Sequence, residues 1–182
     1  MSTMECRTIL HQKEVEITLH RLACQLIENH GDFSETALIG LQPRGLMLAE
    51  RLVQLLQSKG VEDLSYGTLD ITFFRDDFRR RDEPLSANKT AIDFLVEGKK
   101  VVFLDDVLYT GRSVRAALDA INSFGRPKEV ELLVLINRRF TRQLPIEPNY
   151  VGRNIDSMMS EKVKVMWKDP DGVDQVELLS EY

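Results

Sequence analysis

VVFLDDVLYTGRS, residues 101–113, decides both the fold and the kind of site that this chain builds. Its apolar start predicts a strand over residues 101–106 that is covered on both faces. Asp105 and Asp106 stand at the carboxyl end of that strand, where open parallel sheets hold their ligands. Residues 110–113, TGRS, then open a helix whose free N–H groups can hold a phosphate. Carboxylates for hydroxyls or Mg²⁺, beside amides for a phosphate, indicate a phosphorylated sugar as the ligand.

Each half of this stretch also has a plainer explanation. The two acids alone fit a solvated strand end, and TGRS alone fits an ordinary helix cap. The complete string favours a ligand site over both. A Walker A loop is excluded because no G-x-x-x-x-G-K-S/T occurs. A response-regulator receiver also uses an acid pair, but it gives no reason for TGRS four residues later.

The whole stretch resembles the 5-phosphoribosyl-1-pyrophosphate (PRPP) motif of type I phosphoribosyltransferases: a hydrophobic strand, two acids, three residues, then T-G-R/K-S/T. The resemblance implies that Asp105 and Asp106 hold the ribose hydroxyls, directly or through Mg²⁺, and that residues 110–113 anchor the 5′-phosphate. It also implies that the whole stretch binds PRPP, with the residues Val101, Val102, Phe103, Leu104, Asp105, Asp106, Val107, Leu108, Tyr109, Thr110, Gly111, Arg112 and Ser113.

Length and composition bound the class of protein. A chain of 182 residues suits one α/β domain, so we expect residues 1–182 to form a single domain. Its 43% hydrophobic and 29% charged residues are ordinary for a soluble protein, and no apolar run approaches the roughly 18 residues that span a membrane. No signal peptide is visible, which makes the cytoplasm the expected location. A net charge of −5 disfavours indiscriminate nucleic-acid binding but allows a local basic face.

Strands and helices alternate along the chain. Apolar spacing predicts helices over 13–29, from 46 to near 60 and from 114 to near 125, with strands over 36–41, 65–74, 101–106 and 130–138, then short strands near 149–152, 162–167 and 173–179. Alternation of this kind favours a parallel sheet with right-handed crossovers. We therefore expect the type I phosphoribosyltransferase fold, a central, mostly parallel, twisted sheet flanked by helices, with a small hood of short strands and a flexible loop.

The turn LQPRG, which follows the strand over residues 36–41, is a second anion site by position. Arg44 and Gly45 stand between a strand end and a helix N-terminus, where anions bind. Alone, the turn fits a plain connection with a solvated arginine. The resemblance implies that it is the pyrophosphate loop, formed by Gly40, Gln42, Pro43, Arg44 and Gly45. The sequence leaves open whether the Gln42–Pro43 bond is cis.

The charged segment that begins near Arg75 is the expected flexible loop. Residues 75–90 lack apolar periodicity and contain Pro84, which fits either a solvated loop or a lid over the bound diphosphate. A lid would exclude water from the cationic ribose that the departing pyrophosphate leaves. Under that interpretation Arg75, Asp76 and Asp77 belong to the site.

The resemblance extends over nearly the full chain. LIGLQPRGLMLAERL (38–52), LDITFFRDDF (69–78), the RxLPIEPxYVG pattern of 142–152 and SEKVKV (160–165) are similar to the PyrR branch, pyrimidine operon regulators with uracil phosphoribosyltransferase activity. This implies conversion of uracil and PRPP to UMP and pyrophosphate with Mg²⁺, by a homodimer or larger homo-oligomer. Purine-specific relatives carry an acid before the T-G pair. Tyr109 stands there instead and, with a reference pKa near 10, is a poor base at neutral pH.

The expected base pocket follows the strand over residues 130–138. The resemblance implies Ile136, Asn137 and Arg138 there, where PyrR proteins carry an Asp-Arg pair. Asn137 removes one negative charge, which leaves two outcomes open, a neutral exchange or weaker turnover.

RNA binding is the other function that the resemblance implies, and here the chain departs from the pattern. The candidate face for pyr leader mRNA retains Arg21, Arg142 and Arg153, but His20 and Cys24 replace Thr and His, and Glu147 replaces a cation. We expect weak or absent leader binding, since Glu147 repels phosphates. Three hypotheses remain: an enzyme, an RNA-binding attenuation protein, and a non-catalytic nucleotide sensor.

Overall fold

In the computed structural model, which describes residues 4–75 and 89–181, helices and strands alternate as the apolar spacing predicts. The elements in chain order are β1 (Met4–Leu10), α1 (Gln12–His30), β2 (Thr36–Gln42), α2 (Gly45–Ser58), β3 (Ser65–Asp70), η1 (Thr72–Phe74), β4 (Lys100–Leu108), α3 (Arg112–Ile121), η3 (Asn122–Phe124), β5 (Glu129–Arg139), β6 (Tyr150–Asp156), β7 (Lys162–Met166), α4 (Lys168–Asp171) and β8 (Gln175–Glu181).

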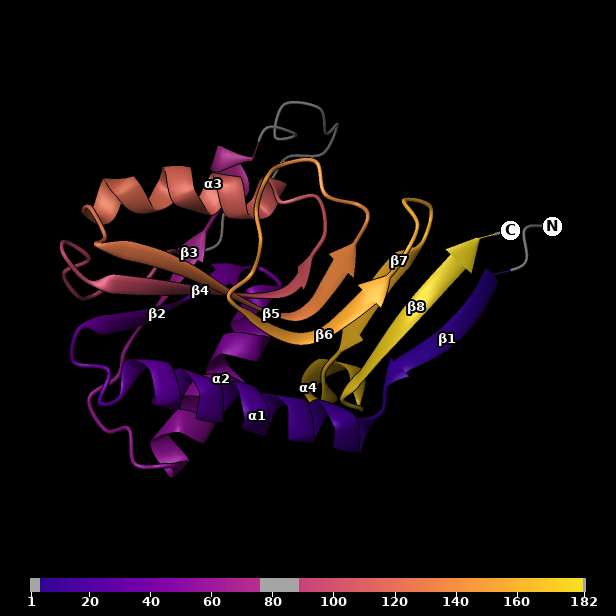
Figure 1. The fold of residues 1–182 in the computed structure, drawn as a ribbon, viewed down its shortest axis with the longest axis horizontal. Coiled ribbons are helices and arrows are strands. Elements are labelled where there is room, and N and C mark those ends of the chain that lie inside the picture. The colour runs from indigo at the N-terminus through magenta and orange to yellow at the C-terminus, as the bar shows by residue number, and fades with distance from the viewer. Residues whose placement is uncertain (1–3, 76–88, 182) are drawn as a thin grey trace.

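The central sheet has five parallel strands in the order β3-β2-β4-β5-β6. Helices α1 and α2 cover one face and α3 covers the other, as Figure 1 shows. The middle strands are apolar on both sides because each face packs on helices, and residues 101–104 are fully buried. The predicted α/β architecture is confirmed. None of the helices in the described ranges is long and apolar enough to cross a membrane.

Two predicted strand ends differ from the structure. β4 continues to Leu108, so Asp105 and Asp106 lie inside the strand rather than at its last two positions. The strand expected over 65–74 ends at Asp70, because the Asp70 carboxylate accepts hydrogen bonds from the Thr72 amide and hydroxyl at 2.9 and 2.6 Å. These local bonds start the short 3₁₀ helix η1 in place of a longer strand.

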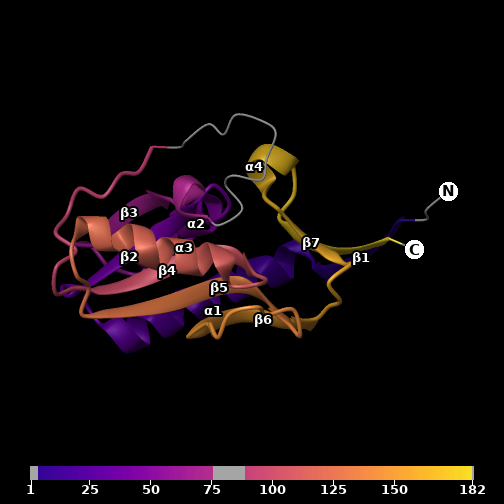
Figure 2. The ribbon, with the colours of Figure 1, turned by 90° about the horizontal axis from the view of Figure 1, so that it is seen from above.

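A smaller antiparallel sheet, β1-β8-β7, forms the hood. Figure 2 shows it reaching out from one end of the central sheet, with both chain termini at its far end. Two features differ from the prediction. Strand β1, which no pattern indicated, pairs with β8, and β6, expected among the short hood strands, instead extends the central sheet beside β5.

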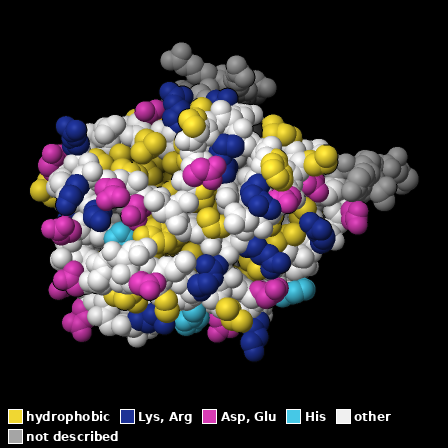
Figure 3. All heavy atoms as spheres, in the orientation of Figure 1, with side chains coloured by type: hydrophobic (Ala, Val, Ile, Leu, Met, Phe, Trp, Pro, Cys, Tyr) yellow, Lys and Arg dark blue, Asp and Glu magenta, His cyan; other side chains and the backbone are white. Residues whose placement is uncertain are grey.

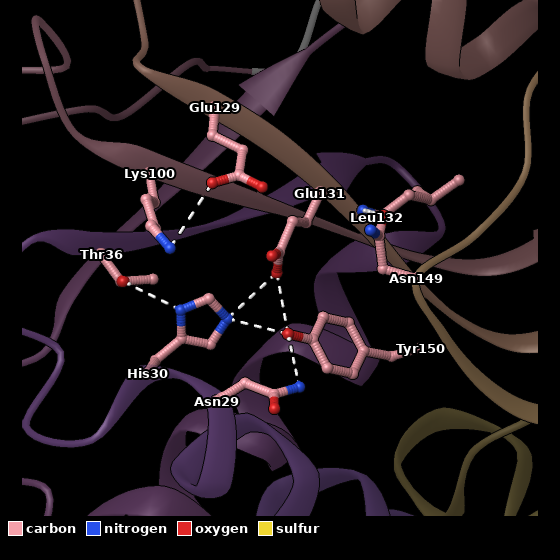
Figure 4. A network of polar contacts seen from close by, with 9 residues as sticks. All are labelled: Asn29, His30, Thr36, Lys100, Glu129, Glu131, Leu132, Asn149 and Tyr150. Carbon is pink, nitrogen blue, oxygen red and sulfur yellow. Dashed lines mark hydrogen bonds and ion pairs between the residues drawn. The ribbon is translucent and has the colours of Figure 1, made fainter.

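A partly buried polar network lies at the opposite end of the strands from the acid pair (Figure 4). His30, at the end of α1, contacts Thr36 Oγ1 through Nδ1 at 3.1 Å and Glu131 through Nε2 at 3.0 Å. The Tyr150 hydroxyl donates to Glu131 at 2.8 Å and accepts from Asn29 at 3.1 Å. Burial raises the pKa of Tyr150 to about 12. The network joins α1 to the starts of β2, β5 and β6, far from the chemistry described next.

Candidate active site

Two buried carboxylates near the end of β4 form the centre of the site. Asp105 is 8% exposed and Asp106 is 4% exposed, and Asp105 Oδ1 accepts a hydrogen bond from the Asp106 amide at 2.9 Å. Burial, together with the charge of Asp106, raises the pKa of Asp105 well above its usual range. Burial also raises the pKa of Asp106, although the Arg44 guanidinium opposes the shift. Such a pair favours a ligand that brings positive charge or hydroxyl donors.

The expected pyrophosphate loop packs directly against this pair. The Gln42–Pro43 bond is cis, and Gln42 Nε2 donates to Lys89 O at 3.0 Å. Gly45 opens α2 so close to β4 that a Cβ there would overlap the Leu104 carbonyl oxygen and lie 3.1 Å from Asp105 Cα. The absence of a side chain at Gly45 therefore brings the turn, with Arg44, against the acids.

Gly40 allows a similar close approach on the other side of the loop. A Cβ at Gly40 would lie 2.9 Å from the Ala49 Cβ, so β2 and α2 meet through two small residues. Glycine at positions 40 and 45 therefore allows α2 to pack closely on β2 and β4.

The predicted phosphate loop turns from β4 into α3 at Gly111. Gly111 has φ 91°, in the left-handed region, and caps the helix N-terminus. The Arg112 amide donates to Thr110 Oγ1 at 3.4 Å, and Arg112 Nε donates to Gln143 Oε1 at 2.9 Å. The start of α3 therefore offers amides, hydroxyls and a guanidinium group to an anion.

Arg75 brings the start of the expected flexible loop to the same place. Its Nη1 donates to Ser113 Oγ at 3.3 Å, and its charge lowers the pKa of Asp105 against the larger effect of burial. Asp76 and Asp77, also assigned to this loop, lie outside the described residues. Arg44 and Arg75 thus place a positive charge beside each member of the acid pair.

The expected base-pocket residues stand beside the end of β4. Asn137 on β5 pairs with Leu108 on β4. Its Nδ2 donates to Asn154 Oδ1 at 2.8 Å and its Oδ1 accepts from Arg142 at 2.6 Å, so this amide is held on both sides. Arg138 lies with its guanidinium 4.0 Å from the Tyr109 ring centroid. Ile136 is fully buried in the core, so it supports the site rather than facing a ligand.

The candidate RNA-face arginines do not share one environment. Arg21 donates to the carbonyls of Val151 and Gly152, and Arg153 lies 3.6 Å from Glu14. Arg142 instead points toward the site, where it donates to the Tyr109 carbonyl and to Asn137. Figure 3 shows acidic and basic side chains interspersed over the face that contains α1.

Sequence reasoning missed the role of residues 141–146. Their amides at Gln143 and Leu144 donate to the Thr110 carbonyl at 3.0 and 3.2 Å, and Leu144 and Ile146 would pack on a Cβ at Gly111. This segment therefore holds the phosphate loop from outside. The RxLPIEPxYVG pattern indicates that this segment is functionally important, but it does not indicate that the segment contacts the phosphate loop.

The donor set at the acid pair suits a magnesium ion that arrives with its ligand. Within residues 4–75 and 89–181 no group of three or more His, Cys, Asp or Glu side chains could hold a metal. Mg²⁺ commonly takes one or two carboxylates from the protein and the remaining oxygens from substrate phosphates and water. Asp105 and Asp106 fit that arrangement and do not fit a closed, all-protein metal site.

The architecture and this arrangement of loops define a phosphoribosyltransferase of type I. Residues 6–169 match the family described as phosphoribosyl transferase domain. A hypoxanthine phosphoribosyltransferase from Staphylococcus aureus superposes with a TM-score of 0.69 at 18% identity, covering 93% of this chain and 90% of that one. The enzyme from Trypanosoma cruzi gives 0.69 at 14% identity, covering 97% of both chains. Likeness at such low identity concerns the fold alone.

Sequence relatives define the group more narrowly. The protein named Bifunctional protein PyrR from Gloeothece citriformis is 46% identical over 171 residues, covering 94% of this chain and 96% of its own. Those of Synechocystis sp. and Chloroflexus aurantiacus are 43% and 41% identical, over 94% and 95% of this chain and 95% and 94% of their own lengths. The chain belongs to the PyrR proteins of the phosphoribosyltransferase family. The resemblance predicted from the sequence is confirmed.

Proposed function

We propose that this protein is a uracil phosphoribosyltransferase, which converts uracil and PRPP to UMP and pyrophosphate, and that regulation through leader RNA is weak or absent in it. The observation that supports the enzymatic activity is that three structural features lie together at one end of the central sheet. These are the acid pair, the Arg44 turn and the N-terminus of α3. Together they match a ribose, a diphosphate and a 5′-phosphate.

The reaction breaks the bond between the ribose C1 and a pyrophosphate oxygen and forms a bond from C1 to uracil N1, which loses its proton. Positive charge develops on the ribose ring as the pyrophosphate separates. The carboxylates of Asp105 and Asp106 stabilise that charge, and Arg44 stabilises the negative charge of the leaving group. Tyr109 is a poor base, so the rate comes from positioning and electrostatics.

Mg²⁺ would be held by Asp105 and Asp106, directly or through water, together with oxygens of PRPP. When bound, it neutralises the charge of the diphosphate that leaves. The protein's own residues then bind the two ends of PRPP and exclude water. We also propose that this protein forms a homodimer or a larger homo-oligomer, because it belongs to the PyrR proteins.

Incubating the protein with PRPP, uracil and Mg²⁺ should yield UMP and pyrophosphate in equal amounts, and a chelator should abolish the reaction. Arg44→Gln should lower kcat/KM about a hundredfold, because it removes a charge that acts on the leaving group. The exposed Arg126→Gln is the matched control and should leave the rate unchanged. PRPP or UMP binding without product from the wild-type protein would instead establish the nucleotide sensor.

Binding to the protein's own pyr leader RNA should be weak at physiological salt and little changed by UMP. Arg21 and Arg153 already have partners within the protein, Arg142 turns toward the site, and Glu147 adds an exposed negative charge. Glu147→Lys should strengthen binding and steepen its salt dependence by about one unit in the log–log slope. Tight, UMP-enhanced binding of the unchanged protein in a gel shift would contradict this expectation.

A further inference from the structure

The side of the acid pair on which the base must approach follows from the chemistry. The pyrophosphate leaves toward Arg44 on the β2 side, so a base that attacks C1 from the opposite face comes from the β5 side. This step rests on the proposed function. The described groups on that side include Tyr109, Asn137, Arg138 and residues 157–161, which we call the hood loop.

Arg138 binds this hood loop through three hydrogen bonds. Its Nε donates to Ser157 Oγ at 2.8 Å, and its Nη2 donates to the carbonyls of Met158 and Glu161 at 2.7 and 2.9 Å. The residue is only 4% exposed, so these bonds form away from bulk water. A planar guanidinium can reach separated acceptors at once, which a lysine ammonium cannot.

The same guanidinium lies against Tyr109, the residue between the acid pair and the phosphate loop. Its carbon is 4.0 Å from the Tyr109 ring centroid. The Tyr109 hydroxyl in turn donates to the Met159 carbonyl at 3.4 Å. Arg138 and Tyr109 therefore connect the hood loop to β4 at the level of the ribose site.

The hood loop is also closed on itself and tied to β8. The Met158 amide donates to Glu161 Oε2 at 2.6 Å, and the Ser180 hydroxyl donates to Glu161 Oε1 at 3.0 Å. Outside these bonds, the side chains of Met158 and Met159 are 73% and 56% exposed. These bonds hold the hood loop in one conformation, and Arg138 holds the hood loop at its observed position relative to Tyr109.

We propose that Arg138 is a positioning residue, which holds the hood loop against Tyr109 and so sets the affinity of the site for the pyrimidine base, without acting on the ribose phosphate. Its nearest ligand-facing neighbour, Tyr109, carries that effect to the base. The phosphate loop is held by the amides of Gln143 and Leu144, which donate to the Thr110 carbonyl. The three side-chain hydrogen bonds of Arg138 go to Ser157, Met158 and Glu161 instead, so a change of this side chain removes none of the bonds to Thr110.

Calorimetry with UMP and with ribose 5-phosphate separates the two halves of the nucleotide, base and ribose phosphate, without any turnover. The dissociation constant for ribose 5-phosphate divided by that for UMP measures the contribution of the base. Arg138→Lys should reduce that ratio about tenfold, because the fork that binds three acceptors is lost. Its dissociation constant for ribose 5-phosphate should stay within about twofold of the wild-type value. Tyr109→Phe should reduce the ratio by about threefold, since it loses only one long hydrogen bond.

The exposed neighbour Arg139, which pairs with Asp156 at 2.6 Å, provides the matched control as Arg139→Lys and should leave both constants unchanged. An unchanged ratio in Arg138→Lys, or an equal weakening of both ligands, overturns the proposal. Should Arg138→Lys fail to fold by circular dichroism, an unchanged ratio in Tyr109→Phe overturns it instead. Failure of the wild-type protein to make UMP defeats the proposed enzyme but leaves this ratio measurable, and absence of UMP binding defeats both.

Discussion

The double variant Asp105→Asn/Asp106→Asn is expected to lose UMP formation by about a thousandfold and to unfold at a higher temperature than the wild-type protein at neutral pH. The loss of rate follows because neutral amides cannot stabilise the positive charge on the ribose. The gain in stability follows because the two carboxylates are 8% and 4% exposed, and the cost of burying their charge outweighs the attraction of the nearby arginines.

The pH dependence gives this prediction its sign. Both carboxyl groups have a pKa raised above that of the unfolded chain, where aspartate titrates at about 3.9. Their contribution to stability is therefore fully present below that pH and is lost as the pH rises through the raised values. The stability advantage of the double variant should be absent in acid and grow toward neutral pH.

Thermal unfolding without Mg²⁺ or PRPP, from pH 4 to pH 8, measures this difference. A change of 1 kcal/mol shifts the midpoint by about 2–4 °C in a chain of this size. Asp119→Asn, at an exposed acid that pairs with Arg115 on α3, is the matched control and should show no such pH-dependent gain. If the double variant were less stable than the wild type at pH 8, burial of the two charges would not destabilise the protein, and this explanation would be wrong.

Gly45→Ala should cost about 3 kcal/mol of unfolding free energy and most of the affinity for PRPP. The added methyl group would overlap the Leu104 carbonyl, which belongs to the backbone of β4 and cannot rotate away. The start of α2, with Arg44, must then move away from Asp105. The higher helix propensity of alanine offsets only about 1 kcal/mol of this cost.

Gly98→Ala separates this effect from the general cost of replacing glycine. Gly98 has φ +75°, and a methyl group at this position would meet nothing within 4 Å. Alanine there should therefore cost about 1 kcal/mol and leave PRPP binding unchanged. Urea unfolding and PRPP titration of both variants provide the comparison. Equal losses in the two variants would mean that close approach at Gly45 is unimportant for the site.

The features that are local in sequence were predictable. The strand, acids and helix start of residues 101–113 form one continuous unit, and the structure contains this strand and helix start, although β4 continues two residues further than predicted, to Leu108. The Arg44 turn was predictable for the same reason, since a glycine beside a helix start has a meaning that needs no distant partner. Even so, the end of β3 was missed, because the side chain of Asp70 and not the apolar pattern ends that strand.

Features that depend on distant partners were not predictable. Strand β1 is defined by its pairing with β8, about 170 residues later, and its own sequence shows no clear alternation. β6 belongs to the central sheet because it pairs in parallel with β5, and the local sequence of β6 does not indicate this partner. Likewise, the sequence identifies Arg138 and Arg142 as candidate site residues. Their contacts with Tyr109 join residues about 30 positions apart, so only the folded structure shows them.

Steady-state rates of the wild-type protein with PRPP and each of uracil, orotate, hypoxanthine and guanine test the central claim most directly. The fold is shared with hypoxanthine phosphoribosyltransferases, so only the residues at the site distinguish the base. Because Tyr109 stands where purine-specific enzymes carry an acid, kcat/KM for uracil should exceed that for each other base by at least about a hundredfold. A kcat/KM for hypoxanthine or guanine that equals or exceeds that for uracil would contradict the account.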